Sequence, residues 1–399
     1  MPSRRAPRRQ EEIQVLDSSS ASSQSSHRRP PRIIALREPP PLYIVDLSLA
    51  PGERYTQICS DYRHEMEELV GIYDEILSMT SFPRFFAWIA KILLNKVYSK
   101  EETKEIKGIS NITNIPLHLV VAYNTFLDLF SGCMSGGTRV KVPQAKDTRM
   151  MHFRNLDWDM EPLRDMIIRV EYVRGGTVVA RGVTYAGYVG VLTGVREGLS
   201  ISMNYRSRAL SESHSSTFAN RLHHLSLLLG KRPSIATHLR DILLAPGRLP
   251  GLDELSVLFK TTTASSCYVT FCTPSAVMIV EKDLGSAVTH VSDSFLAVTN
   301  HDAAVENWSA TRWQDAMQKV KDMGIGGARE ILEESLDRKE CMCNLWSRKG
   351  GENARLSASD LKIWLRTYPI RNESTHFSCI MDPSVPGGGL VWVETCYPQ

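Results

Sequence analysis

The pattern of hydrophobic and polar positions changes character close to residue 133. Before this point, one half-buried strand at Tyr43–Leu49 is followed by helical patterns at about 55–77, 82–94 and 117–130. Beyond it, blocks of strands alternate with blocks of helices. The predicted strands are 150–154, 166–173, 178–185, 199–205, 268–272, 276–281, 295–299, 376–381 and 390–394, and the predicted helices are 217–229, 234–244, 252–260, 310–323 and 328–335. Hairpin-length spacing of the strands predicts an α+β fold, with two antiparallel sheets, helices packed outside them and a helical N-terminal part.

Residues 1–40 have a composition that does not support folding. Four arginines stand among the first nine residues, and seven serines lie between Ser18 and Ser26. So little apolar surface cannot offset the entropy lost on ordering, so this tail is predicted to be disordered. Arginine and serine are also enriched in organellar targeting peptides, but Glu11, Glu12 and Asp17 argue against that interpretation.

Overall composition excludes several classes of function. The net charge of +3 gives no reason to expect a nucleic-acid partner. The eight cysteines lack the spacing of a zinc site, so neither a metal nor a cofactor is expected. No run of 18 apolar residues predicts a membrane span, and no apolar core follows the early arginines as in a secretory signal. We therefore expect a cytoplasmic or peripheral membrane location, which the sequence alone leaves open.

One predicted helix, Phe82–Leu94, is unusually apolar and carries lysines only at positions 91 and 96, at its end. Most such stretches are core helices. The alternative is an interfacial helix that presses its aromatic face into a membrane or micelle surface. The second interpretation gains weight if the substrate is a lipid.

Cys133 stands out because of its setting. An isolated cysteine is usually a buried small hydrophobic residue. This one follows Gly132 at the point where a predicted helix hands over to a sheet, and Arg154 and Asp157 follow near the end of a strand.

The sequence around Cys133 resembles that of a known family. The stretch around Cys133, together with Arg154-Asn-Leu-Asp-Trp158, is similar to the acid ceramidase and N-acylethanolamine-hydrolysing acid amidase family. This family is a branch of the N-terminal-nucleophile hydrolases related to bile-salt hydrolases and penicillin V acylase. Three more blocks resemble it in order: Tyr43–Leu49, the run from Tyr185 through Gly194 to Asn204, and Val298-Thr-Asn-His-Asp302. The resemblance spans roughly residues 42 to 382 and implies the αββα sandwich of these hydrolases.

The resemblance implies self-cleavage between Gly132 and Cys133. It divides the chain into a helical N-terminal (alpha) segment over 41–132 and a catalytic (beta) segment over 133–399, which would stay together as an alpha/beta heterodimer. The freed α-amino group of Cys133 has an ordinary pKa of about 8 and can act as the general base of its own thiol. This chemistry needs no histidine partner.

Further roles come from the resemblance residue by residue. Arg154 would lie beside the thiol, stabilise its thiolate and help to hold the acyl carbonyl. Asp157 would orient the new α-amino group, Asn300 would donate to the oxyanion, and Arg312 would lie near that oxyanion. The residues expected at the substrate are Asn204, Trp158 and Tyr188. Without the other blocks, Arg154 and Asp157 would be interpreted as a structural ion pair at a strand end.

The sequence departs from the family at three places. The interval from Cys133 to Arg154 is 21 residues, several more than usual, and the polar stretch 139–148 accounts for the excess as a hairpin tip. Met134 replaces a small hydroxyl residue, and Tyr205 stands where the animal enzymes have an acidic residue. The last change puts the rate or pH dependence of self-cleavage in question. The relatives are lysosomal, whereas no signal is visible here.

Three functions remain open at this stage. The first is an amidohydrolase that cleaves ceramide or an N-acylethanolamine, with a lipid amide as its substrate. The second is a penicillin V acylase or bile-salt hydrolase-like amidase, or an acyltransferase, of the same fold. The third is an inactive lipid-binding or scaffold homologue, suggested by Tyr205 and the lengthened loop.

Overall fold

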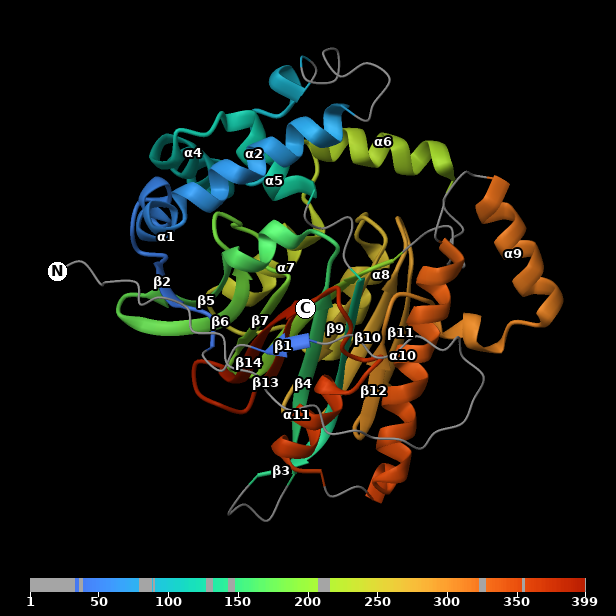
Figure 1. Cartoon of the computed structure of the whole chain (residues 1–399). Coiled ribbons are helices and arrows are strands. Elements are labelled where there is room, and N and C mark those ends of the chain that lie inside the picture. The colour runs from blue at the N-terminus through green and yellow to red at the C-terminus, as the bar shows by residue number, and fades with distance from the viewer. Residues whose placement is uncertain are drawn as a thin grey trace.

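Two β-sheets form the centre of the molecule, as the computed structural model in Figure 1 shows. The structure describes residues 33–35, 39–78, 88, 90–126, 132–142, 148–206, 216–322, 328–353 and 356–398. Helices cover the outer faces of both sheets, and a helical layer closes one end. This arrangement agrees with the predicted α+β sandwich of two sheets flanked by helices.

The first sheet contains six strands in the order β1-β14-β13-β4-β3-β12, and all its pairings are antiparallel. Its members are β1 (Ile33–Ala35), β3 (Gly132–Lys141), β4 (Thr148–Asp157), β12 (Phe295–Val298), β13 (Thr375–Asp382) and β14 (Gly389–Pro398). Strand β1 lies within the tail that we predicted to be disordered. That prediction is wrong for these three residues, since the edge of β14 offers them backbone partners; the rest of 1–38 lies outside the described residues.

The second sheet contains eight strands in the order β11-β10-β9-β8-β7-β6-β5-β2. Its members are β2 (Leu42–Asp46), β5 (Ile167–Arg174), β6 (Thr177–Tyr185), β7 (Thr193–Arg196), β8 (Leu199–Tyr205), β9 (Cys267–Cys272), β10 (Val277–Lys282) and β11 (Ala287–Ser292). Strand β2 pairs with β5 in parallel, so this sheet is antiparallel except at its edge. Between β2 and β5 the chain forms the N-terminal helices and then β3 and β4 of the other sheet. A connection of this length allows two neighbouring strands to be parallel, whereas a short hairpin does not.

Hydrogen-bonded side chains join the two sheets at their inner faces. The ring of His152, on β4, contacts the hydroxyls of Ser200 and Ser202 on β8 at 3.0 and 2.7 Å. The Ser135 and Thr270 hydroxyls, on β3 and β9, lie 2.8 Å apart. All five side chains are buried. Burial lowers the pKa of His152 to about 3, so its ring stays neutral between the sheets.

Helices cover the outer faces. Helices α7 (Ile235–Leu244) and α8 (Leu252–Thr261) pack on the eight-stranded sheet, and α10 (Ala328–Arg348) and α11 (Ala358–Arg366) pack on the six-stranded sheet. Helix α9 (Ala310–Asp322) lies beside α10 at the periphery. The end layer contains α1 (Thr56–Asp61), α2 (Arg63–Ser78), α4 (Lys100–Thr113), α5 (Leu117–Phe126) and α6 (Thr217–Leu228). The part of the chain described here contains no helix that is long and apolar enough to span a membrane.

Strand β3, which begins at the candidate junction, was not predicted. Its sequence is rich in glycine, and glycine is depleted in strands. Close packing explains the composition, because a Cβ added to Gly136 would lie 2.1 Å from the carbonyl oxygen of Leu296. Strands β3 and β4 pair from Gly132 with Asp157 to Lys141 with Thr148. Residues 139–141 and 148 of the predicted hairpin tip therefore belong to the strands, and 143–147 lie outside the described residues.

The N-terminal helices are tied to the body by buried charges. Glu105, on α4, accepts hydrogen bonds from Arg54 and from both terminal nitrogens of Arg240 on α7, and it is fully buried. Glu102, one turn earlier, accepts a 2.8 Å bond from the Thr237 hydroxyl and lies 3.9 Å from Arg240. Helix α4 was not predicted, because these glutamates occupy positions where the helical pattern calls for apolar residues.

Glu102 makes stability depend on pH. Burial raises the pKa of Glu102 to about 7, so the folded protein binds its proton more tightly than the unfolded chain does. The free energy of unfolding should therefore fall by about 3 kcal/mol as pH rises from about 4.5 to about 7. Urea unfolding at pH 5 and pH 7 should show most of this loss, about 2 kcal/mol, in the wild-type protein and not in Glu102→Gln. The exposed neighbour Glu101 provides the control, since Glu101→Gln should retain the loss. Equal pH dependence of Glu102→Gln and wild type would contradict the assignment.

Candidate active site

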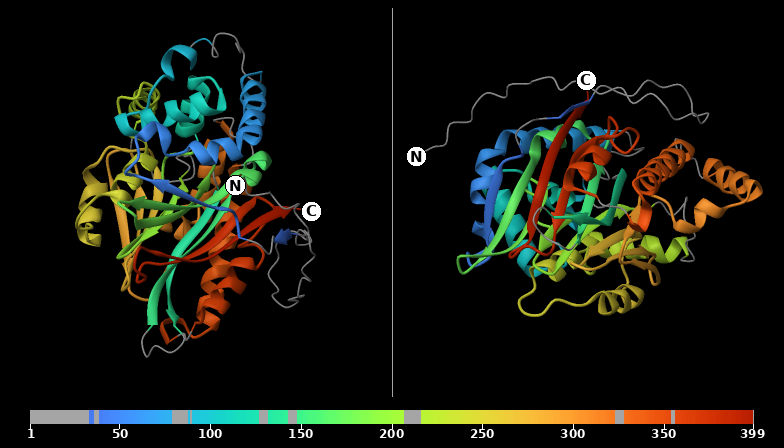
Figure 2. Two further views of the ribbon diagram at one scale, coloured as in Figure 1. Left: turned by 90° about the vertical axis from the view of Figure 1, so that its left-hand side faces the viewer. Right: turned by 90° about the horizontal axis from the view of Figure 1, so that it is seen from below.

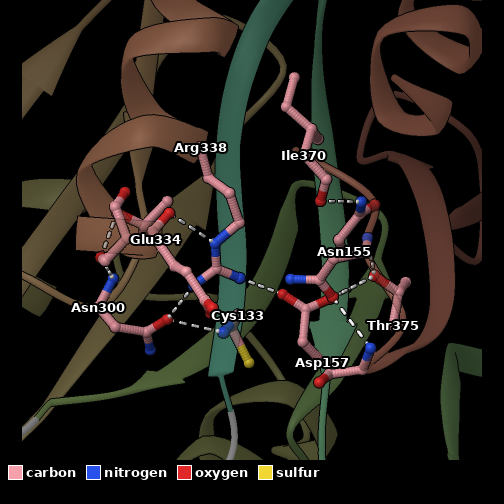
Figure 3. Close-up of polar contacts among 12 residues, drawn as sticks. Cys133, Asn155, Asp157, Asn300, Glu334, Arg338, Ile370 and Thr375 are labelled. Atoms are coloured by element: carbon pink, nitrogen blue, oxygen red, sulfur yellow. Dashed lines mark hydrogen bonds and ion pairs between the residues drawn. The ribbon is translucent and has the colours of Figure 1, made fainter. Parts of the chain in front are cut away.

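Cys133 is the second residue of β3 and is fully buried in the uncut chain. Its backbone N–H donates a 2.9 Å hydrogen bond to Oδ1 of Asn300, which follows β12 on the neighbouring side of the sheet. This bond joins residues 167 positions apart in sequence. Cleavage before Cys133 would turn this N–H into the α-amino group, which would already lie beside Asn300 (Figure 3).

Arg154, on β4, lies beside the thiol as the resemblance implied. Its Nη2 is 3.3 Å from Sγ of Cys133 and donates to the carbonyl of Met203 at 2.7 Å, and Nη1 donates to the carbonyl of Leu192. The guanidinium is therefore held by backbone carbonyls, and the thiol is its ionisable neighbour. A thiolate formed here would meet a fixed cation, which favours the nucleophilic form.

Asp157 lies at the end of β4, directly opposite Gly132. It accepts a 2.7 Å hydrogen bond from the Thr375 hydroxyl and forms an ion pair with Arg338. Burial raises the pKa of its carboxyl, and Arg338 and the Thr375 hydroxyl oppose part of that rise. An ion pair with Arg154 at the strand end was the alternative interpretation, and the contacts of Asp157 are with other groups.

Arg338 connects the two sides of the junction (Figure 3). This side chain, on α10, is 4% exposed and donates from Nη1 to Asp157 and from Nη2 to Oδ1 of Asn300 at 3.0 Å. Oδ1 of Asn300 thus accepts from two donors, and its Nδ2 donates to the carbonyl of Tyr205 at 2.8 Å. This set of partners fixes the orientation of the amide. The expected donation of Asn300 to an oxyanion stays a prediction that requires the second Nδ2 hydrogen.

The chain is similar in sequence to proteins of known activity. A family model described as the beta subunit of N-acylethanolamine-hydrolyzing acid amidase matches residues 38–97. The N-acylethanolamine-hydrolyzing acid amidase of Caenorhabditis elegans is 27% identical over 368 residues, which are 86% of this chain and 89% of the relative. The acid ceramidases of Heterocephalus glaber and Homo sapiens are 26% and 27% identical, over 43% and 42% of this chain and 46% and 45% of theirs.

Over most of its length the chain is similar to the N-acylethanolamine-hydrolyzing acid amidase, and over less than half of it to the acid ceramidases. A solved structure of the Caenorhabditis elegans ortholog is 24% identical, covers 67% of this chain and all of that chain, and has a TM-score of 0.47. The residues that the family model matches, 38–97, lie almost entirely within the N-terminal segment that we labelled alpha.

The role predicted for Arg312 stays a prediction. Arg312 is exposed on α9, with its guanidinium 5.0 Å from the ring centre of Trp308. Arg338 lies beside Asn300. A sequence signal for it exists: on α10 the buried positions are 332, 335, 338 and 342, so an arginine stands within a buried helical stripe. Such a residue needs a buried partner.

The three residues predicted to contact substrate are all buried in the uncut chain. Asn204 donates from Nδ2 to the carbonyls of Val298 and Thr299, and thereby ties β8 to the end of β12. Trp158 stacks on His376, and Tyr188 meets Tyr123 edge to face. The structure gives Asn204 a structural contact, and substrate binding by the three residues stays a prediction.

The described residues include no group of three His, Cys, Asp or Glu side chains that could hold a metal ion. His376, near Trp158, accepts or donates a 2.8 Å bond with the Tyr185 hydroxyl. Burial lowers the pKa of His376 to about 3, so it is a poor general base at neutral pH.

Proposed function

We propose that this chain is an amidohydrolase that cleaves the amide bond of N-acyl lipids, either ceramide or an N-acylethanolamine, through an acyl-cysteine intermediate. The observation that carries the proposal is the contact set of Cys133. Its backbone nitrogen meets Asn300, its Sγ meets Arg154, and its preceding residue lies opposite Asp157. The similarity to amidases and ceramidases in the same family supports the class of substrate.

The mechanism begins with self-cleavage. The Cys133 thiol attacks the carbonyl carbon of Gly132, the acyl group moves from nitrogen to sulfur, and water hydrolyses the resulting thioester. The products are the carboxylate of Gly132 and the free α-amino group of Cys133. That amine lies next to Oδ1 of Asn300 and close to the Asp157–Arg338 pair, which orient it toward the thiol.

The freed amine then serves in turnover. It removes the thiol proton as Sγ attacks the acyl carbon of the lipid amide, and it returns a proton to the departing amine. Water, activated by the same amino group, hydrolyses the acyl-cysteine to a fatty acid. Arg154 stabilises the thiolate before attack, because its guanidinium is fixed by the carbonyls of Leu192 and Met203.

A substrate panel tests this proposal. Purified protein is incubated from pH 4.5 to 8 with ceramide, an N-acylethanolamine, penicillin V and a bile-salt conjugate, and the released acid is quantified. We expect two fragments on a denaturing gel and release of fatty acid from the N-acyl lipids. Release from penicillin V or the bile salt alone supports the same-fold acylases instead. An uncut, inactive chain at every pH supports the inactive lipid-binding homologue, which Tyr205 at an acidic position of the family favours.

The segment Phe82–Leu94 is proposed as part of a surface for a membrane or micelle. Only Trp88 and residues 90–94 of it are described, with Trp88 59% and Ile92 49% exposed. Helix α6 lies nearby, since a Cβ on Gly230 would approach the Lys96 carbonyl to 3.0 Å. This helix exposes Phe218, Leu222 and Leu225 at helical spacing. Exposed apolar side chains on two neighbouring helices fit an interfacial site.

The double variant Phe218→Ser/Leu222→Ser is expected to bind phosphatidylcholine vesicles at least about tenfold more weakly. Burial of each apolar side chain in the lipid contributes about 1.5–3 kcal/mol to the free energy of binding. Co-sedimentation measures the binding. Val288→Ser/Val291→Ser is a matched control, since Val288 and Val291 are also more than half exposed but lie on β11. Equal vesicle binding by both double variants would rule out α6 as the contact surface.

A further inference from the structure

The loop that follows β12, Thr299–Asp302, carries Asn300 and is held from two sides. On the α10 side, Ser335 provides the contacts: its hydroxyl accepts from the Asn300 backbone N–H at 2.8 Å and lies 2.8 Å from Nδ1 of His301. The Thr299 hydroxyl donates to the Ser335 carbonyl at 2.9 Å. These bonds fix the backbone of the loop and leave the side chain of Asn300 to be fixed from elsewhere.

On the other side, Arg206 and Asp302 form a buried two-pronged ion pair. Nε and Nη2 of Arg206 each lie 2.7 Å from one carboxylate oxygen of Asp302. The Tyr268 hydroxyl donates to the same carboxylate at 2.7 Å, and Nη1 of Arg206 donates to the Lys282 carbonyl at 3.0 Å. Arg206 is 4% and Asp302 is 1% exposed. Such bidentate contacts fix both distance and angle between the partners.

The Arg206–Asp302 pair lies next to a second contact between the end of β8 and the loop Thr299–Asp302. Nδ2 of Asn300 donates to the carbonyl of Tyr205, and Tyr205 directly precedes Arg206 at the end of β8. Asp302 lies two positions after Asn300. The two cross-links therefore close a small ring between the end of β8 and the loop. Movement of Asp302 away from Arg206 would carry the Asn300 amide away from Tyr205 and from Cys133.

We propose that Arg206 and Asp302 are a positioning pair, which holds the Asn300 amide against the nitrogen of Cys133. Neither residue touches Cys133 in the contacts described, so the pair acts through Asn300. The hydrolytic consequence rests on the proposed function: loss of the pair lowers kcat of the amidase while the substrate still binds. Misplacement of a reacting group by about 1 Å costs on the order of 100-fold in rate.

The test uses a variant that removes the pair without leaving a buried charge. Arg206→Met/Asp302→Leu/Tyr268→Phe replaces the three polar partners together, and replacing a buried ion pair by apolar residues of similar volume is often neutral for stability. Arg181→Met/Glu171→Leu is the matched control, because this pair has a 2.7 Å contact on β5 and β6 at the far side of the sheet. Thermal unfolding verifies that both variants are folded.

Two measurements then decide. In a Cys133→Ala background, which cannot cut, hydrogen exchange of the amide at position 133 reports the bond to Asn300 without any substrate. We expect exchange about tenfold faster in the triple variant and unchanged in the control. In the cut enzyme we expect kcat to fall about 100-fold with KM within about twofold. Unchanged exchange at position 133 in the folded triple variant would overturn the proposal. A wild-type protein without hydrolytic activity would overturn the proposed function and leave the exchange result to decide the role of the pair.

Discussion

Replacement of Cys133 by alanine is expected to leave the chain uncut and to abolish amide hydrolysis. Both reactions use the same sulfur, and alanine supplies neither a nucleophile for the Gly132 carbonyl nor an acyl acceptor. Loss of the nucleophile in an enzyme of this kind lowers kcat by roughly 10⁴-fold or more. A denaturing gel shows the missing fragments, and fatty-acid release from the best lipid of the panel measures the missing turnover.

Two controls separate chemistry from folding in this experiment. Cys379→Ala removes a thiol that is equally buried, on β13, and should retain both the cut and the activity. Cys133→Ala itself should unfold at nearly the wild-type temperature, because the side chains are similar in size. A cut chain or measurable turnover in folded Cys133→Ala would rule out Cys133 as the nucleophile of both reactions.

Replacement of Arg338 should have the second-largest effect. Arg338→Met removes the cation that Asp157 and Oδ1 of Asn300 share. It leaves the Asp157 carboxylate buried with the Thr375 hydroxyl as its remaining partner, which should destabilise the protein by about 3–5 kcal/mol. It should also slow self-cleavage and turnover by roughly 10²–10³-fold, because two groups that flank the Cys133 nitrogen lose their orientation.

Stability and activity can be separated by a second change. Arg338→Met/Asp157→Asn removes the unpaired charge, so we expect most of the stability to return while activity stays low. Arg312→Met is the control, because Arg312 is exposed on α9 and should leave kcat and the cut unchanged. The opposite result, with activity lost in Arg312→Met and kept in Arg338→Met, would support the role that the sequence suggested for Arg312.

Arg338, which was not predicted, shows how far sequence reasoning could reach. Cys133, Arg154 and Asp157 lie on one hairpin, so strand register sets their spacing, and the family resemblance pointed to all three. Asn300 was found through the short motif around it. Arg338, on α10, lies 38 positions after Asn300 in the sequence. Its contact with Asn300 depends on how α10 packs on the sheet. Helical spacing can mark Arg338 as a buried position, but it does not indicate which distant residues its side chain contacts.

The missed elements have a common physical cause. Strand β3 was missed because close contacts demand glycine where strands usually carry β-branched residues. Helix α4 was missed because it buries Glu102 and Glu105, whose partners Thr237 and Arg240 come from α7. Helix 55–77 was predicted as one piece, and it ends and restarts around Tyr62. For β3 and α4 the deciding partners lie far away in sequence, so tertiary contacts override the local pattern.

The long sequence separation in the Cys133–Asn300 hydrogen bond has a consequence for timing. Asn300, which accepts the hydrogen bond from the Cys133 nitrogen, is translated 167 residues after Cys133. Arg338 is translated later still. A nascent chain on the ribosome passes Cys133 long before either group exists. Since domains acquire their tertiary contacts only when all contributing segments have emerged, the proposed cut would be confined to finished, folded molecules. Chains that stall or misfold during synthesis would keep the α-amino group of Cys133 in a peptide bond, and without this general base they would not acquire hydrolytic activity.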